Sequence, residues 1–190
     1  MEFYSPDKGH IYVDGAELQN FEVQEIRKAV VYVSQEDFLF TASVRENLKM
    51  GNEEISDEEM IEISRKMGVH QFVSKMEREY DSVLEERGKN LSKGQRQKLS
   101  LTRAILRHPK ILILDEATSN MDSISEREIL NYIKGIRDIT LILISHRINV
   151  IADSDCIYVL QKGNIVARGT DKQLKEQCKL YRQLYGEEEK

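Results

Sequence analysis

The sequence has few of the features that mark secreted, metal-binding or nucleic-acid-binding proteins. Its 190 residues include two cysteines, Cys156 and Cys178, whose spacing is unlike that of metal ligands, so we expect both to be reduced and structural. No apolar run reaches the roughly 18 residues of a membrane span, and the first residues show no basic and apolar export signal. A formal net charge of -5 argues against a nucleic-acid partner.

Short apolar runs alternate with helical stretches along most of the chain. The runs are continuous, as in strands buried on both faces, and they lie at 30–33, 111–114 and 141–144. Helices are expected at about 23–28, 52–67, 93–106, 125–135 and 172–185. A strand and turn at 11–15 and a hairpin at 156–167 complete the pattern. Because helices separate the strands, the sequence predicts an α/β fold with a parallel sheet.

Two adjacent carboxylates, Asp115 and Glu116, follow the apolar run 111–114. Acidic side chains at the end of a buried strand are costly unless they have ligands or partners, and ligands of doubly wound folds bind at the carboxyl ends of strands. An aspartate there can hold Mg²⁺ through its waters, and a glutamate can polarise an attacking water for phosphoryl transfer. The alternative is an acidic N-cap for the next helix, and these residues alone do not decide between the two.

The stretch 91–97, Leu-Ser-Lys-Gly-Gln-Arg-Gln, stands at the start of an expected helix. Ser92 as N-cap and Gly94 in the first turn would leave backbone N–H groups and the positive end of the helix dipole facing a ligand. That arrangement suits a phosphate, which the acidic net charge does not exclude because such sites depend on local dipoles. Taken alone, however, the stretch favours a plain serine-capped helix.

Gln35 and His146 also follow expected strands. His146 comes after the run 141–144 and would reach a terminal phosphate if the two strands are neighbours. A histidine at a strand end is also often structural. The amide of Gln35 would ligate Mg²⁺ or position a water, but taken alone it indicates nothing.

In their order along the chain, these segments resemble the motifs of the ABC ATPase family over essentially all 190 residues. The matching motifs are the Q-loop at Gln35, the signature at 91–97, the Walker B strand at 111–116, the D-loop at 119–122 and the switch histidine at His146. One departure is Lys93, which replaces the first glycine of the signature pair and would be strained if that position required a positive φ. We expect it to be tolerated.

The resemblance implies ATP and Mg²⁺ as cofactors. Glu116 would be the general base, and His146 would hold the γ-phosphate. Gln35 would contact Mg²⁺ and the attacking water, and Asp115 would be the outer-sphere partner of the metal. These residues are assigned by their match to the family's motifs in this sequence.

The same resemblance implies that catalysis needs two such domains arranged head to tail, as a homo- or heterodimer. The signature residues Ser92, Lys93, Gly94 and Gln95 would face the γ-phosphate of an ATP held mainly by the opposite subunit, and Asp122 would communicate across the dimer interface.

The implied fold is that of P-loop NTPases, with a helical signature subdomain at about 41–107 inserted in the α/β core. A G-x-x-x-x-G-K-[S/T] loop does not occur in residues 1–190. We therefore interpret 1–190 as a partial ABC ATPase domain that lacks the P-loop strand. We expect these residues by themselves to be inactive in ATP hydrolysis.

Two further stretches resemble ABC exporters in particular. Segment 39–48 is similar to the exporter segment that faces the coupling helices of the transmembrane domain, and Glu86-Arg87-Gly88 is similar to the loop that contacts the partner's membrane domain. The resemblance implies an exporter subunit at the cytoplasmic face of a membrane that couples ATP hydrolysis to transport. The alternative is a non-transport or degenerate ABC-type interaction module without ATPase activity.

Overall fold

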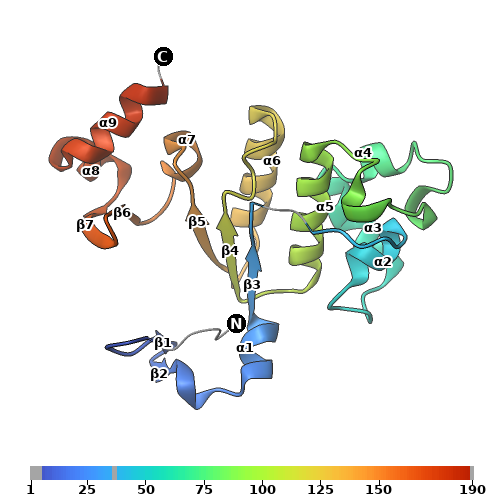
Figure 1. The fold of residues 1–190 in the computed structure, drawn as a ribbon, viewed down its shortest axis with the longest axis horizontal. Coiled ribbons are helices and arrows are strands. Elements are labelled where there is room, and N and C mark those ends of the chain that lie inside the picture. The colour runs from blue at the N-terminus through green and yellow to red at the C-terminus, as the bar shows by residue number, and fades with distance from the viewer. Residues whose placement is uncertain (1–5, 36–37, 189–190) are drawn as a thin grey trace. The chain divides into compact units, whose positions relative to one another are not determined.

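The structure is a computed structural model that describes residues 6–35 and 38–188, and Figure 1 shows the order of its elements. The chain divides into two compact units, Met1–Ile142 and Leu143–Lys190. Among the described residues, no helix has both the length and the apolar character that a membrane crossing requires. The helical subdomain predicted at about 41–107 lies inside the first unit, and its limits stay a prediction.

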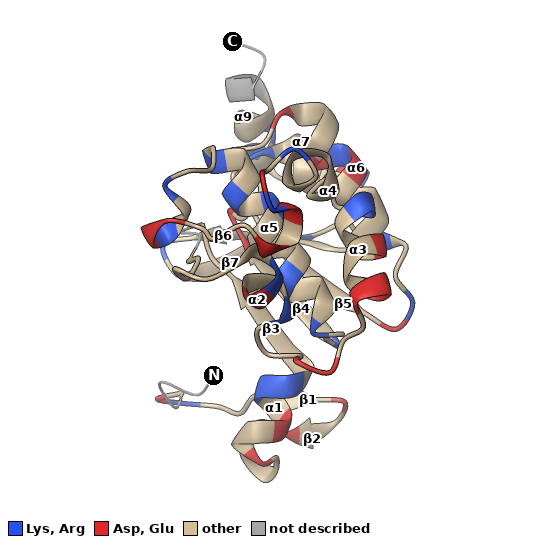
Figure 2. Cartoon of the chain, turned by 90° about the vertical axis from the view of Figure 1, so that its right-hand side faces the viewer, with Lys and Arg blue, Asp and Glu red and all other residues tan. Residues whose placement is uncertain are grey.

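The first unit begins with a small antiparallel hairpin of β1 (Tyr12–Val13) and β2 (Ala16–Glu17). Asp14 and Gly15 form its turn with φ angles of 49° and 80°. Positive φ at both central residues is the geometry that matches the twist of paired strands, which confirms the predicted turn. A 3-10 helix (Leu18–Asn20) and α1 (Val23–Ala29) follow, and the last turn of α1 is basic, coloured blue in Figure 2.

The central sheet has the strand order β3-β4-β5, with β3 at Val30–Val33, β4 at Ile111–Asp115 and β5 at Thr140–Ile144. β3 and β4 pair in parallel, with Val33 opposite Leu114. The predicted parallel sheet is therefore confirmed.

Burial on both faces of these strands was expected, but the described residues bury one face more completely. Val31 and Val33 are 4% and 5% exposed, whereas Tyr32, which points to the other face, is 44% exposed. The apolar runs arise because the second face is also apolar, although the described residues cover it only in part.

The chain between β3 and β4 is helical and supplies much of the buried core of the first unit. Its α-helices are α2 (Val44–Lys49), α3 (Asp57–Lys66), α4 (His70–Val73) and α5 (Lys93–Leu106), and its 3-10 helices are Glu79–Asp81 and Glu86–Gly88. α5 has the predicted bounds. α3 begins five residues later than predicted, because Ser56 caps it by accepting a hydrogen bond from the Glu59 N–H at 3.1 Å. α6 (Ser123–Lys134) follows β4, close to the predicted helix.

The second unit contains α7 (Ile148–Ile151), β6 (Ile157–Gln161), β7 (Asn164–Gly169), α8 (Asp171–Gln177) and α9 (Lys179–Glu188). β6 and β7 form the predicted antiparallel hairpin. Its core is a single apolar cluster of Ile148, Ile157, Val159, Leu174, Cys178 and Tyr181. Cys156 and Cys178 are both free thiols, as expected.

The single final helix predicted at about 172–185 is wrong, because Cys178 is extended, with φ -113° and ψ 109°, and divides it into α8 and α9. Arg182, beyond the break, bonds back to the end of α8. Its guanidinium donates hydrogen bonds to the carbonyls of Lys175 and Glu176, both at 2.9 Å. These carbonyls at the end of α8 would otherwise lack partners, so the arginine stabilises the helix end.

Asp171 ties the two C-terminal helices together. Its Oδ1 accepts hydrogen bonds from the hydroxyls of Tyr181 at 2.9 Å and Tyr185 at 2.8 Å, and its Oδ2 lies 2.9 Å from the Lys175 ammonium. Partial burial opposes ionisation, but the bonds from Lys175, Tyr185 and Tyr181 outweigh it and lower the pKa of Asp171.

We predict that Asp171→Asn destabilises the second unit by about 1 kcal/mol at neutral pH, because it removes the ion pair and weakens two hydrogen bonds. A lowered carboxylate pKa stabilises the fold above the unfolded-state pKa, and this stability is lost as pH falls through the folded-state value. Thermal unfolding of both proteins between pH 7 and pH 2 measures this. The stabilities of the wild type and Asp171→Asn should converge near pH 2. A stability difference that stays the same over the whole pH range would contradict the stabilising role of the Asp171 carboxylate.

Candidate nucleotide site

Ser92 caps the start of α5 through a reciprocal pair of hydrogen bonds. Its Oγ accepts from the Gln95 N–H at 3.2 Å, and the Gln95 Oε1 accepts from the Ser92 N–H at 2.9 Å. This capping box satisfies two helix-end donors and fixes the direction in which the chain enters the helix. The plain structural interpretation of Ser92 is therefore correct, and a ligand at this helix end would meet an already rigid first turn.

A groove of about 530 Å³ opens at this end of α5. It brings the four predicted signature residues together with the predicted D-loop aspartate, although Gln95 and Asp122 are 27 positions apart in sequence. Its lining residues are Gly68, Gln71, Phe72, Lys75, Ser92, Lys93, Gly94, Gln95, Lys98, Asn120, Met121 and Asp122. With three lysine side chains and a helix N-terminus, the groove favours an anionic ligand.

The two central signature positions differ in what they require of their residue. Lys93 is the first residue of α5 and is not among the residues with positive φ, so a lysine is unstrained there. Gly94 is constrained by space instead, since a Cβ at this position would lie 3.0 Å from the Asn120 carbonyl oxygen. Close approach of the 119–122 segment is therefore a reason for glycine at position 94, and the sequence pattern did not reveal it.

Asp122 is the N-cap of α6. Its Oδ1 accepts a hydrogen bond from the Ser125 N–H at 2.9 Å, and the hydrogen bonds from Ser125 lower the pKa of this carboxyl. The side chain is exposed at the rim of the groove. Capping fixes the orientation of Asp122 and keeps its negative charge at the rim.

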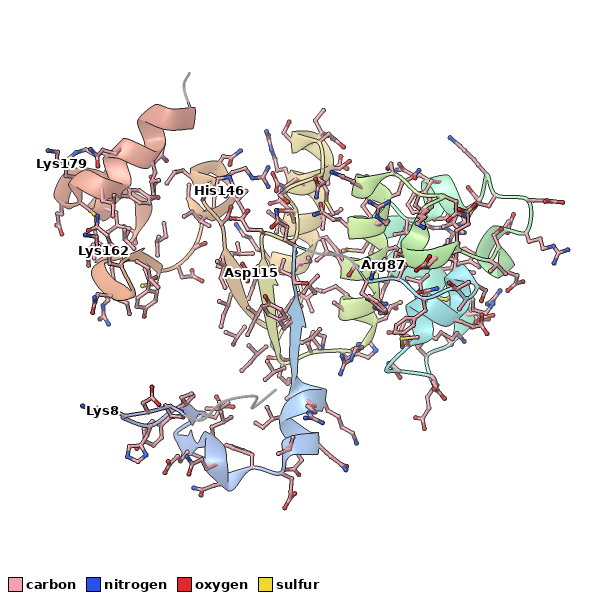
Figure 3. All side chains as sticks on the ribbon, in the orientation of Figure 1. Lys8, Arg87, Asp115, His146, Lys162 and Lys179 are labelled. Carbon is pink, nitrogen blue, oxygen red and sulfur yellow. The ribbon has the colours of Figure 1, made fainter. Side chains whose placement is uncertain are left out.

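Asp115 ends β4 and is labelled in Figure 3. Its Oδ2 accepts a hydrogen bond from the Tyr32 hydroxyl at 2.8 Å, across the parallel pair of β3 and β4. The bond to Asp115, followed by partial burial and the negative charge of Asp115, raises the pKa of Tyr32. Sequence reasoning missed Tyr32, whose only signal was its place in the strand that leads to Gln35.

Glu116 follows at once in a left-handed backbone conformation with φ 53°. For a residue other than glycine this costs on the order of 1–3 kcal/mol. The conformation turns the chain sharply out of β4, and it leaves Glu116 half-buried beside the strand end. A strained carboxylate at the carboxyl end of a parallel strand is consistent with a role in chemistry.

Gln35 stands at the same edge of the sheet as Asp115. It lies two residues beyond Val33, whose register partner is Leu114, and its side chain is exposed. Carboxylate and amide oxygens are ligands that Mg²⁺ accepts, so these two residues fit the predicted cation. In the described part of the chain, no cluster of three or more histidine, cysteine or acidic side chains could hold a metal by itself. A cation here would complete its shell with waters and phosphate oxygens.

His146 is exposed just after β5 and is also labelled in Figure 3. It belongs to the second unit, whereas Asp115 and Glu116 belong to the first. Its predicted contact with the γ-phosphate therefore stays a prediction.

A parallel sheet with paired carboxylates at a strand end, beside a serine-capped helix and an anion-favouring groove, is the arrangement of a nucleotide-binding α/β domain. Residues 1–119 match the family model described as ABC transporter. The chain belongs to the ABC transporter family.

Known relatives agree with this assignment. The heterocyst differentiation ATP-binding protein HepA of a Nostoc species is 43% identical over 92% of this chain and 29% of its own length. The mitochondrial iron-sulfur clusters transporter ABCB7 of Oryzias latipes is 38% identical over 92% of this chain and 24% of its own. A solved bacterial Atm1-family ABC exporter with ATP bound is 30% identical, with a TM-score of 0.93 over 98% of this chain and 33% of that one. The chain thus spans about a quarter to a third of these relatives.

We predict that Tyr32 and Asp115 are energetically coupled. In a double-mutant cycle of Tyr32→Phe and Asp115→Asn, the coupling should be favourable and about 0.5–1 kcal/mol at pH 8, because the pair is partly open to solvent. The raised pKa of Tyr32 means that neutral phenol is favoured in the folded state, so this stabilisation is present below the ordinary tyrosine pKa and is lost as pH rises through the raised value. Urea unfolding of the four proteins measures the coupling, and additive effects at pH 8 would contradict it.

Proposed function

We propose that this chain is the nucleotide-binding domain of an ABC exporter and couples ATP hydrolysis to transport across a membrane, at its cytoplasmic face. The observation that carries the proposal is the groove at the start of α5, where the signature residues and Asp122 line one anion-favouring surface. The Atm1-family exporter that resembles the chain was solved with ATP bound, which supports ATP as the ligand.

The groove suits the terminal phosphate of an ATP that another subunit holds. Ser92 and Gly94 present the first turn of α5, and Lys93 adds a positive charge beside them. A second domain arranged head to tail would supply the rest of the nucleotide site. Gln95 orients Ser92 through the capping box, and Asp122 would meet the second domain from the rim.

Hydrolysis also requires a cation and an activated water, which would lie at the carboxyl ends of β3 and β4. Gln35 would contact Mg²⁺ and Asp115 would hold the ion through its waters, and the bound ion would neutralise developing charge on the phosphates. Glu116 would orient the attacking water and accept its proton, and its fixed backbone conformation keeps the carboxylate at the end of β4. His146 would stabilise charge on the γ-phosphate.

A patch of exposed apolar side chains fits the contact with the membrane domain. We define the coupling surface as Phe38, Phe40 and Val83, which are 53%, 40% and 62% exposed. The two phenyl rings form an edge-to-face pair with centroids 4.7 Å apart. Val83 belongs to the segment that pairs with Ser43, so it stands beside the strand-like stretch after Phe40.

Backbone and arginine contacts make this surface rigid. The Arg103 guanidinium of α5 donates a hydrogen bond to the Phe38 carbonyl at 2.8 Å, and the Leu84 N–H donates to the Ala42 carbonyl at 2.9 Å. Exposed aromatic side chains on a fixed backbone are typical of protein contact sites. The coupling surface is thus tied directly to the helix that begins at the groove, which suits the transmission of movement. No observation on the described residues favours a degenerate interaction module instead.

We predict that Glu116→Gln lowers the ATPase kcat of the full-length protein by about 10²–10⁴-fold, because the amide cannot accept the proton of the attacking water. ATP binding should persist. Phosphate release and nucleotide binding, measured on the same membranes, separate the two effects.

The matched control is Glu128→Gln, which removes an equal charge from an exposed position on α6. Its kcat should equal that of the wild type. An ATPase rate that survives Glu116→Gln would disprove the role of Glu116, and a wild-type protein without ATPase activity would disprove the proposed function.

We also predict that Phe40→Asp uncouples the domain from the membrane domain. A charge placed in an apolar contact disfavours docking, so transport should fall at least about tenfold while ATP binding is unchanged. Ile165→Asp, at an exposed apolar position of β7, is the control and should transport normally. Equal transport by both variants in vesicles would argue against the coupling surface.

A further inference from the structure

One face of α5 holds the segment that follows β4. Gly94, Gln97 and Lys98 stand at positions i, i+3 and i+4 of the helix and therefore share a face. All three meet residues 120–125, which lead from the strand end to α6.

Gln97 makes the central contact. Its side chain is completely buried, and its Oε1 accepts a hydrogen bond from the Asn120 N–H at 2.9 Å. A buried amide side chain is costly unless it is hydrogen-bonded, and an apolar residue would serve the helix core better. The neighbouring core positions Leu99 and Leu101 are apolar, as expected for this helix. The bond from Asn120 satisfies the Gln97 Oε1, whereas the Gln97 Nε2 has no hydrogen-bond partner among the described residues. The bond to Asn120 is therefore the contact that favours a polar residue at 97.

Gly94 and Lys98 add contacts on either side of the bond between Gln97 and Asn120. The missing side chain of Gly94 lets the Asn120 carbonyl oxygen approach to 3.0 Å from the position of a Cβ. The Lys98 ammonium donates a hydrogen bond to the Ser125 hydroxyl at 2.8 Å, and the Ser125 N–H is bonded to Asp122. The Asn120 N–H is thus held by Gln97, the Asn120 carbonyl lies close against Gly94, and Lys98 contacts the start of α6 beyond it.

We propose that Gln97 is a positioning residue that keeps segment 119–122 in register with the start of α5, so that Ser92 and Asp122 face the same groove. This inference rests on the proposed function. Without the acceptor at position 97, the segment would shift relative to Ser92, and the groove would no longer match the terminal phosphate. Displacement of about 1 Å at a catalytic site can cost on the order of 10²-fold in rate. Because the groove would act when the two domains close, the loss falls on kcat more than on KM.

The test compares Gln97→Met with Thr102→Val in the full-length protein. Methionine keeps the length and removes the acceptor. Thr102 is equally buried on the same helix, but its hydroxyl donates a hydrogen bond within α5, to the Lys98 carbonyl at 2.7 Å. Hydrogen exchange followed by mass spectrometry should show at least about tenfold faster exchange of segment 119–122 in Gln97→Met, with no change in Thr102→Val. The ATPase kcat should fall about tenfold only in Gln97→Met, with KM for ATP within about twofold.

Gln97→Glu is the rescue variant, since its carboxyl group retains an acceptor for the Asn120 N–H. Its exchange rate and kcat should lie closer to the wild type than those of Gln97→Met. If hydrogen exchange of segment 119–122 is unchanged in Gln97→Met, Gln97 does not fix this segment. If exchange is faster but kcat is unchanged, Gln97 is not a positioning residue for catalysis. If the wild type hydrolyses no ATP, the proposed function fails, and the exchange comparison still decides whether Gln97 holds the segment.

Discussion

The parallel pairing of β3 with β4 is the constraint on which the candidate site depends. It places the carboxyl ends of two strands side by side, although Val33 and Leu114 are 81 residues apart in sequence. Parallel strands need a long crossover, and here that crossover contains the helices that end in α5. The same pairing therefore creates the edge with Gln35 and Asp115 and delivers the signature helix next to the segment that leaves β4.

Structural and functional interpretations of the same residues turn out to be compatible. Ser92 caps α5 and Asp122 caps α6, yet both line the groove. Capping fixes the side chain and aims the end of each helix, so a capped helix start is already arranged when an anion arrives. The backbone of Glu116 is likewise fixed in advance, because its left-handed conformation lies between the strand before it and the helix after it.

Much of the fold could be predicted because local patterns agree with the tertiary structure. The bounds of α5, the Asp14-Gly15 turn and the order of strands and helices follow from periodicity and turn chemistry. The break at Cys178 was missed because the pattern of 172–185 was interpreted as one helix, whereas Arg182, a residue beyond the break, bonds back to the end of α8. Helical periodicity describes the spacing of apolar residues and does not report such a contact.

The candidate site was predicted by motif order, while the contacts that fix it were not. The bond from Tyr32 to Asp115 and the approach of Asn120 to Gly94 join residues that are far apart in sequence. The groove at the start of α5 is proposed to receive the terminal phosphate of ATP. Photolabelling of the full-length protein in its membrane, with an ATP analogue that carries the reactive group on its γ-phosphate, tests this binding most directly. Label on peptides that contain 91–98 and 119–122, displaced by ATP, is the predicted result, and displaceable label confined to other peptides would contradict it.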